Sequence, residues 1–214
     1  MVFMDPHESL RSAPAISTDK YYMNIAIAVR KKANCLGRRV GAILVRENRI
    51  ISTGYNETPE GVENCLDGGC VRCKDRKTYQ ASVGYDVCIC VHAEQNALIT
   101  AARFGIPVEG AVAYSTMRPC FDCTKALFQA KIAGIHYLHD WTHPIESLAD
   151  QYELLQARFP ERVRQLEMHD PDEEWANNRA QQNQTEVESK TEINQSETKE
   201  LIVNGGILQV QMKQ

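Results

Sequence analysis

Two stretches, His92-Ala93-Glu94 and Pro119-Cys120-Phe121-Asp122-Cys123, decide how this chain folds and what chemistry it can carry. A hydrolytic zinc ion is held by three protein ligands, so that its fourth position can carry water. Water in that position ionises near neutral pH and becomes a nucleophile. His92, Cys120 and Cys123 are suited to be the three ligands. Glu94 follows the histidine closely and is suited to move protons, so we expect a catalytic zinc site with Glu94 as its acid and base.

Each stretch has a plainer interpretation when it is taken alone. A Cys-x-x-Cys pair also occurs in redox centres and in halves of structural zinc sites. A single histidine before an apolar segment is commonly a packing or capping residue. The two stretches together, with a proline directly before the first cysteine, favour the catalytic zinc site.

The local patterns place both stretches at helix starts. Residues 91–104 have helical periodicity, and a second helix is predicted from Pro119 to about residue 133. Cys120 and Cys123 then lie one turn apart on one face. Helix N-termini favour negative charge, which stabilises the thiolate form that binds zinc. We therefore expect the metal between two helix N-termini.

The remaining periodicity alternates strands with helices, which predicts an α/β domain of three layers, α/β/α. The predicted strands are residues 40–45 and 49–55, forming a hairpin, then 111–115, 135–139 and an edge strand at 163–168. Further helices are predicted at residues 20–30 and 147–158. Residues 56–91 lack periodicity and are predicted to form a long loop.

The 214 residues suit one domain with extensions. We expect a flexible N-terminal extension at residues 1–17, the zinc-dependent domain at 18–169, and a polar acidic tail at 170–214. The tail is predicted to be largely disordered. Residues 201–210 within it resemble a hairpin that would need to dock, and a floppy tail is the alternative.

Charge and apolar content exclude several classes of protein. The formal net charge is −4, but residues 170–214 hold nine acids and four bases, a balance of −5, so the remainder carries about +1. A nearly neutral domain has no broad basic face, so no nucleic-acid partner is expected. No apolar run is long enough to span a membrane, and residues 1–17 lack the apolar core of a secretory signal. Grouped cysteines fit metal binding in a reducing compartment, so we expect a cytoplasmic protein.

A second metal site is predicted in the loop. Cys65, Cys70, Cys73, Cys88 and Cys90 offer five thiols there, and a closed structural zinc takes four. We choose the first three with Cys88, because Cys90 lies only two residues before His92. Reduced, packed cysteines remain the alternative, and disulfides are disfavoured.

Four blocks resemble the deoxycytidylate deaminases of the cytidine deaminase superfamily. They are residues 37–43, 52–56, 92–97 and the Pro119-Cys120 to Cys123 block. The resemblance implies a cytidine-deaminase-like fold with a central mixed five-stranded sheet, commonly assembled as a homohexamer. It also implies hydrolysis of a cyclic amidine C–N bond, converting dCMP and water to dUMP and ammonia for thymidylate synthesis.

The resemblance also implies which residues bind the substrate and an effector. Asn56 matches the asparagine that contacts the substrate sugar in this family, although a turn role is the alternative. Ala93 is expected to bind the base through its amide. Three arginines are candidates for binding phosphate: Arg38, Arg39 and Arg118. Arg118 is the candidate for the phosphate of the substrate. For each of the three, a solvated surface charge is the alternative. Arg38 and Arg39 also lie in a block that resembles an effector site for dCTP or dTTP, which Mg²⁺ would accompany.

Three competing functions remain open. A tRNA adenosine deaminase would share the zinc ligands and Glu94, but its RNA partner favours a more basic surface. A free cytidine deaminase typically reads Cys-Ala-Glu where this chain has His92-Ala93-Glu94. A zinc-binding interaction module is the non-enzyme alternative, and it would have no use for Glu94.

Overall fold

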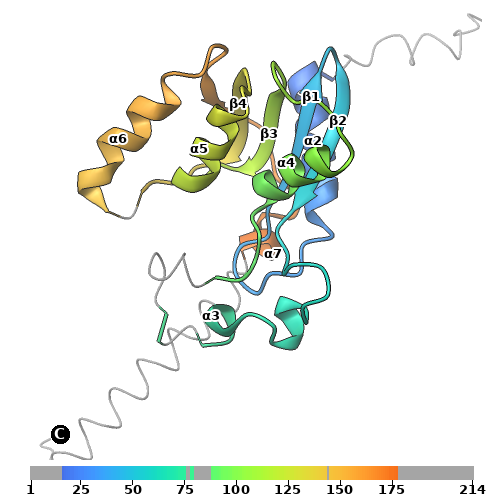
Figure 1. The fold of residues 1–214 in the computed structure, drawn as a ribbon, viewed down its shortest axis with the longest axis vertical. Coiled ribbons are helices and arrows are strands. Elements are labelled where there is room, and N and C mark those ends of the chain that lie inside the picture. The colour runs from blue at the N-terminus through green and yellow to red at the C-terminus, as the bar shows by residue number, and fades with distance from the viewer. Residues whose placement is uncertain (1–15, 76–77, 80–87, 144, 178–214) are drawn as a thin grey trace, which may run out of the picture.

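The computed structural model describes residues 16–75, 78–79, 88–143 and 145–177 (Figure 1). Most of the predicted N-terminal extension and the predicted hairpin at 201–210 lie outside the described residues.

A five-stranded mixed sheet forms the centre of the domain, as expected. Its strand order is β2-β1-β3-β4-β5. β1 pairs antiparallel with β2 and β3, whereas β3, β4 and β5 run parallel. The strands are β1 Gly41–Arg46, β2 Arg49–Tyr55, β3 Val112–Met117, β4 Gly134–His139 and β5 Val163–Gln165.

Helices cover both faces of the sheet. The larger ones are α2 Thr18–Arg30, α4 Ala93–Arg103, α5 Phe121–Gln129 and α6 Glu146–Gln156, with the short α7 Glu173–Asn177 near the end. Successive strand residues point to opposite faces, and Ile43 and Leu44 accordingly enter different cores. Ile43 packs with Met23 of α2, and Leu44 packs with Ala97 and Leu127 of α4 and α5. This arrangement confirms the predicted three layers.

Two glycines allow helices to touch the hairpin backbone. A Cβ atom at Gly54 would lie 2.2 Å from the carbonyl oxygen of Ala93, at the start of α4. A Cβ atom at Gly41 would lie 2.4 Å from the carbonyl oxygen of Ala26 in α2. Neither contact is sterically possible for a larger residue, so the hairpin fixes where α2 and α4 lie.

The long loop contains local structure that periodicity did not reveal. A 3-10 turn, η1, spans Cys65–Asp67, and a one-turn helix, α3, spans Val71–Lys74. In Figure 1 both lie beyond the end of the hairpin, away from α6. None of the described helices is long and apolar enough to cross a membrane.

The domain continues past the predicted boundary at residue 169. Asp170 is buried, and its carboxylate accepts two hydrogen bonds of 2.7 Å from Arg30 and lies 2.6 Å from Nε2 of His139. Arg39 donates a 2.7 Å hydrogen bond to the carbonyl oxygen of Trp175 in α7. The polar composition of this region conceals these long-range contacts, so the ordered domain reaches at least residue 177.

Asp170→Asn is expected to lower the free energy of unfolding by about 3–5 kcal/mol, because it leaves the buried Arg30 charge unpaired. Burial alone would raise the pKa of Asp170, but hydrogen bonds from Arg30 and His139 hold it well below its ordinary value. A lowered folded-state pKa contributes stability above the unfolded pKa of about 3.9, and that stability is lost as pH falls through the folded pKa. Urea unfolding measures the effect: the free energies of unfolding of the wild type and of Asp170→Asn should differ at pH 7 and converge in acid.

Asp122→Asn is the matched control, since the Asp122–Lys125 ion pair lies in solvent and is expected to contribute less than about 1 kcal/mol. Equal losses in the two variants would contradict the buried-pair interpretation.

Candidate zinc centre

The first cluster of metal-binding side chains forms where α4 and α5 begin. His92 is the residue before α4, Cys120 is the residue before α5, and Cys123 lies in the first turn of α5. Nδ1 of His92 lies 3.4 Å from Sγ of Cys120 and 3.4 Å from Sγ of Cys123. Bond lengths of about 2.0–2.3 Å to a tetrahedral zinc place ligand atoms about 3.6–3.8 Å apart. The three atoms therefore fit one zinc ion, with Nδ1 as the histidine donor.

The electrostatics of this cluster favour a cation. The hydrogen bond with Cys123, followed by that with His92, holds the pKa of Cys120 at about 4, so its thiolate forms at neutral pH. The hydrogen bond to Cys120 in turn raises the pKa of His92 to about 9. The Cys120 thiolate thus stabilises positive charge beside it, while the hydrogen bond to Cys120 and burial raise the pKa of Cys123.

Glu94 lies in the first turn of α4 and is 4% exposed. Burial raises the pKa of its carboxyl group, which moves proton exchange toward neutral pH, as acid–base catalysis requires. Ser115 of β3 donates a 2.9 Å hydrogen bond to Oε1 of Glu94. Ser115 was not predicted as a site residue, and its one signal in the sequence is a hydroxyl inside an apolar strand.

Asn56 is buried at the end of β2, and both ends of its amide contact the backbone before β1. Its Oδ1 accepts a 2.7 Å hydrogen bond from the amide of Val40, and its Nδ2 donates a 2.7 Å bond to the carbonyl of Arg38. One Nδ2 hydrogen remains for another acceptor. Ala93 is fully buried at the first residue of α4.

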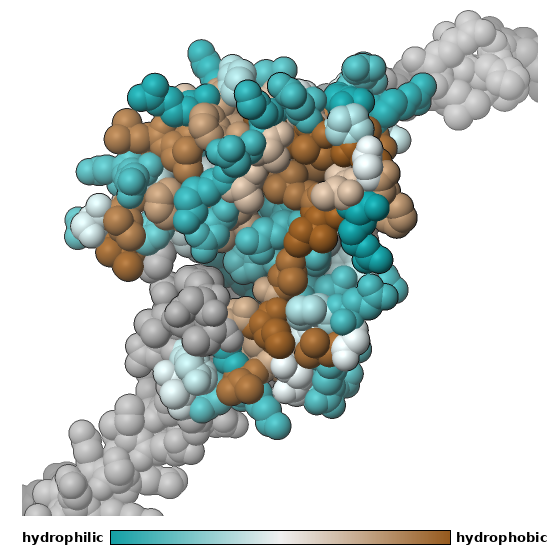
Figure 2. Space-filling view, in the orientation of Figure 1, coloured by the Kyte–Doolittle hydropathy of each residue, from teal (hydrophilic) through white to brown (hydrophobic). Residues whose placement is uncertain are grey.

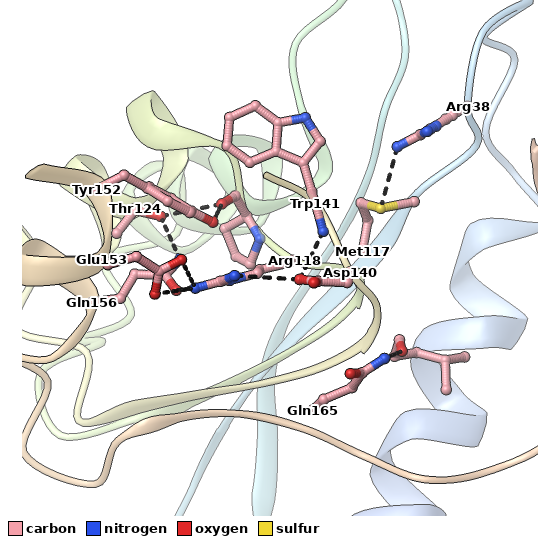
Figure 3. A network of polar contacts seen from close by, with 12 residues as sticks. Arg38, Met117, Arg118, Thr124, Asp140, Trp141, Tyr152, Glu153, Gln156 and Gln165 are labelled. Atoms are coloured by element: carbon pink, nitrogen blue, oxygen red, sulfur yellow. Dashed lines mark hydrogen bonds and ion pairs between the residues drawn. The ribbon is translucent and has the colours of Figure 1, made fainter. Parts of the chain in front are cut away.

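Arg118 does not lie as a phosphate-binding residue should, and this corrects the expectation for it. Its guanidinium donates two 2.7 Å hydrogen bonds to Glu153, bonds of 2.6 and 2.9 Å to Gln156, and one of 3.3 Å to Asp140 (Figure 3). It also lies over the ring of Tyr152, 5.0 Å from its centroid. These contacts use the donors that a phosphate would need, so Arg118 instead ties α6 to the start of α5.

The neighbouring arginines differ from each other. The guanidinium of Arg39 lies 4.5 Å from the ring centroid of Trp175 and holds α7 against the domain. Arg38 is exposed and makes a weak 3.8 Å contact with Sδ of Met117.

A second cluster brings together six cysteines of the described residues. It brings together the predicted Cys65, Cys70 and Cys73, with Sγ of Cys88 3.9 Å from Sγ of Cys70. It also includes Cys90 and Cys35. Cys35 was missed because it lies far from the others in the sequence, just after α2, and no spacing rule connects it to them.

The fold and the three-ligand cluster can be compared with those of known protein families. A family model described as the cytidine and deoxycytidylate deaminase zinc-binding region matches residues 16–139, more than half of the chain. The chain belongs to this family, which confirms the resemblance and supports zinc as the metal.

Several deoxycytidylate deaminases are similar to this chain. The chain is 42% identical over 121 residues to the one from Schizosaccharomyces pombe, covering 56% of this chain and 37% of the relative. It is 39% identical over 131 residues to the one from Saccharomyces cerevisiae, covering 61% of this chain and 40% of that relative. A crystal structure of dCMP deaminase from the cyanophage S-TIM5 with dCMP and dUMP matches with a TM-score of 0.52 and 26% identity, covering 77% of this chain and all of that one. The chain spans about two fifths of the length of the two yeast relatives.

Arg118→Ala is expected to lower the free energy of unfolding by on the order of 2 kcal/mol, because it removes hydrogen bonds from a charged, largely buried group. Chemical denaturation measures the change. Arg103→Ala is the control, since the Arg103–Glu60 pair is exposed and contributes little. A change no larger than the control's would contradict the role of Arg118 in tying α6 to α5.

Proposed function

We propose that this chain is a zinc-dependent hydrolase that converts dCMP and water to dUMP and ammonia, in the step that supplies thymidylate synthesis. The observation that carries the proposal is the buried Glu94 carboxyl beside the His92, Cys120 and Cys123 cluster. Membership of the deaminase family and the likeness to deoxycytidylate deaminases support the choice of substrate.

The proposed roles follow from the positions of the side chains. His92, Cys120 and Cys123 would hold the zinc, which when bound would supply Lewis acidity and a nucleophile from water near neutral pH. Glu94 takes a proton from the attacking water and passes protons to the ring nitrogen and then to the departing amine. The C4–O bond forms first, as the ring nitrogen takes up a proton, and the C4–N bond then breaks as the amine is protonated and leaves as ammonia. Ser115 holds one carboxylate oxygen of Glu94 by a hydrogen bond, which leaves the other oxygen for proton transfer.

Recognition of the nucleotide is proposed at the residues that the resemblance carries over. The remaining Nδ2 hydrogen of Asn56 is available for the sugar, and the backbone amide of Ala93 for the base. For an effector phosphate, the exposed Arg38 is better placed than Arg39, whose guanidinium holds Trp175. The proposed effectors are dCTP and dTTP, with Mg²⁺ bound to the nucleotide.

We also propose a cytoplasmic homohexamer. Several large apolar side chains are more than half exposed, among them Val71, Phe104 and Leu154. Figure 2 shows apolar side chains in a broken strip that runs down this face of the molecule, with hydrophilic residues on either side. Apolar patches of this kind commonly mark contacts between proteins.

A structural zinc is proposed in the cysteine loop, with Cys65, Cys70, Cys73 and Cys88 as the ligands expected from the sequence. The clustering of these sulfur atoms supports a metal there. Such a site would order a loop that has few apolar residues of its own.

Glu94→Gln is expected to lower kcat on dCMP by about 10²–10⁴-fold, because glutamine keeps the shape and the Ser115 contact but cannot transfer protons. Ammonia release is measured with dCMP, deoxycytidine and adenosine-containing tRNA, and zinc content is measured in parallel. Glu109→Gln, at an exposed position before β3, is the control and should retain full activity.

Wild-type protein that is inactive on dCMP, or a Glu94→Gln variant as active as the wild type, would refute the proposal. Preference for deoxycytidine or for tRNA would assign the same chemistry to one of the competing substrates.

A further inference from the structure

The cysteine cluster holds more thiols than one zinc ion can bind. Its members come from three segments, and five of the six are buried: Cys35, Cys65, Cys70, Cys73 and Cys90, with Cys88 partly buried. A structural zinc is almost always four-coordinate. A single ion would therefore leave two thiols packed against a charged metal centre.

Two pairs of sulfur atoms lie at the spacing of ligands on a shared ion. Sγ of Cys35 is 3.9 Å from Sγ of Cys73, and Sγ of Cys70 is 3.9 Å from Sγ of Cys88. Thiolates on a tetrahedral zinc with bonds of about 2.3 Å lie about 3.8 Å apart. A disulfide would need a separation of about 2.05 Å. The two pairs have no residue in common.

The two remaining cysteines lie between these pairs. Cys65 and Cys90 are grouped with Cys35, with their three sulfur atoms within 4.8 Å of one another. On the same criterion, Cys65 is also grouped with Cys70 and Cys73, and Cys90 with Cys70 and Cys88. Cys65 and Cys90 therefore reach both pairs, as thiolates shared between two ions do.

We propose that this cluster binds two zinc ions with six thiolates. Cys35 and Cys73 hold one ion, Cys70 and Cys88 hold the other, and Cys65 and Cys90 bridge them. Two zinc ions held by six cysteines are a known arrangement in DNA-binding modules. This centre rests on the proposal that the cysteine loop binds zinc, and it would replace the single four-cysteine site by two ions that share ligands.

The surroundings suit such a centre. Six thiolates and two Zn²⁺ ions carry a net charge of −2, which backbone amides can offset. The amide of Leu36 donates to Sγ of Cys65 at 3.4 Å, and the amide of Gly37 donates to Sγ of Cys35 at 3.3 Å. At Gly69, a Cβ atom would lie 1.8 Å from the carbonyl oxygen of Glu63, so only glycine fits the turn that leads into Cys70.

The test is the metal content of the full chain, measured by elemental analysis and by mass spectrometry under non-denaturing conditions. We expect three zinc ions per chain, and two in His92→Ala. A content of two, falling to one in His92→Ala, would overturn the binuclear cluster and leave the single structural zinc. A content of one, falling to zero, would overturn both, while deamination of dCMP tests the catalytic proposal separately.

Single substitutions distinguish terminal from bridging ligands. Cys35→Ser and Cys88→Ser should each lower the content by one ion, because each removes a terminal ligand of a different ion. Cys65→Ser should lower it by two. If any one of the six cysteines can be replaced without loss of metal, the proposal is wrong.

Cadmium NMR of the wild-type chain provides a test that needs no variant. Two all-thiolate ¹¹³Cd resonances are expected, both coupled to the β-protons of Cys65 and of Cys90. A single all-thiolate resonance, or two that share no cysteine, would overturn the proposal.

Discussion

The contact between β2 and the start of α4 at Gly54 is the constraint on which the zinc centre depends. With no side chain at this position, the strand lies directly against the carbonyl of Ala93. The hydroxyl of Ser52 donates to the carbonyl of Ala97, and Nδ2 of Asn96 donates to the carbonyl of Tyr55, so the helix cannot slide along the strand. The position of α4 sets the positions of His92 and Glu94. The geometry of the His92 and Glu94 pair is thus a consequence of helix-on-strand packing.

The two cysteines of the centre are positioned by contacts between α5 and α6. Cys120 and Cys123 are carried by α5, and Tyr152 of α6 donates a 2.7 Å hydrogen bond to the carbonyl of Pro119. Arg118 joins the same region to α6 through Glu153 and Gln156 (Figure 3). The two cysteines are therefore positioned by side chains from a helix that holds none of the zinc ligands.

Local signals predicted most of this architecture. The hairpin, α4 and α5 were predicted because their periodicity and the proline at residue 119 are local signals that act within a few residues. His92, Glu94, Cys120 and Cys123 were predicted because zinc chemistry restricts the residue types and their spacing. The contacts that escaped prediction join distant segments: Cys35 with the loop, Asp170 with Arg30, and Arg118 with α6. Composition and periodicity contain no information about such pairs. The sequence therefore does not distinguish a buried arginine from a solvated one.

The cysteine cluster connects the segment after α2 to the residues just before α4. Once occupied by metal, it would close a chain loop of more than fifty residues, from Cys35 to Cys90. Cross-links of that length remove conformational entropy from the unfolded chain. When the link is a disulfide, this raises the free energy of unfolding by about 4 kcal/mol. A metal link gives a similar restriction under reducing conditions, where disulfides do not persist. The free energy of unfolding of this protein would then depend on how much zinc its surroundings supply.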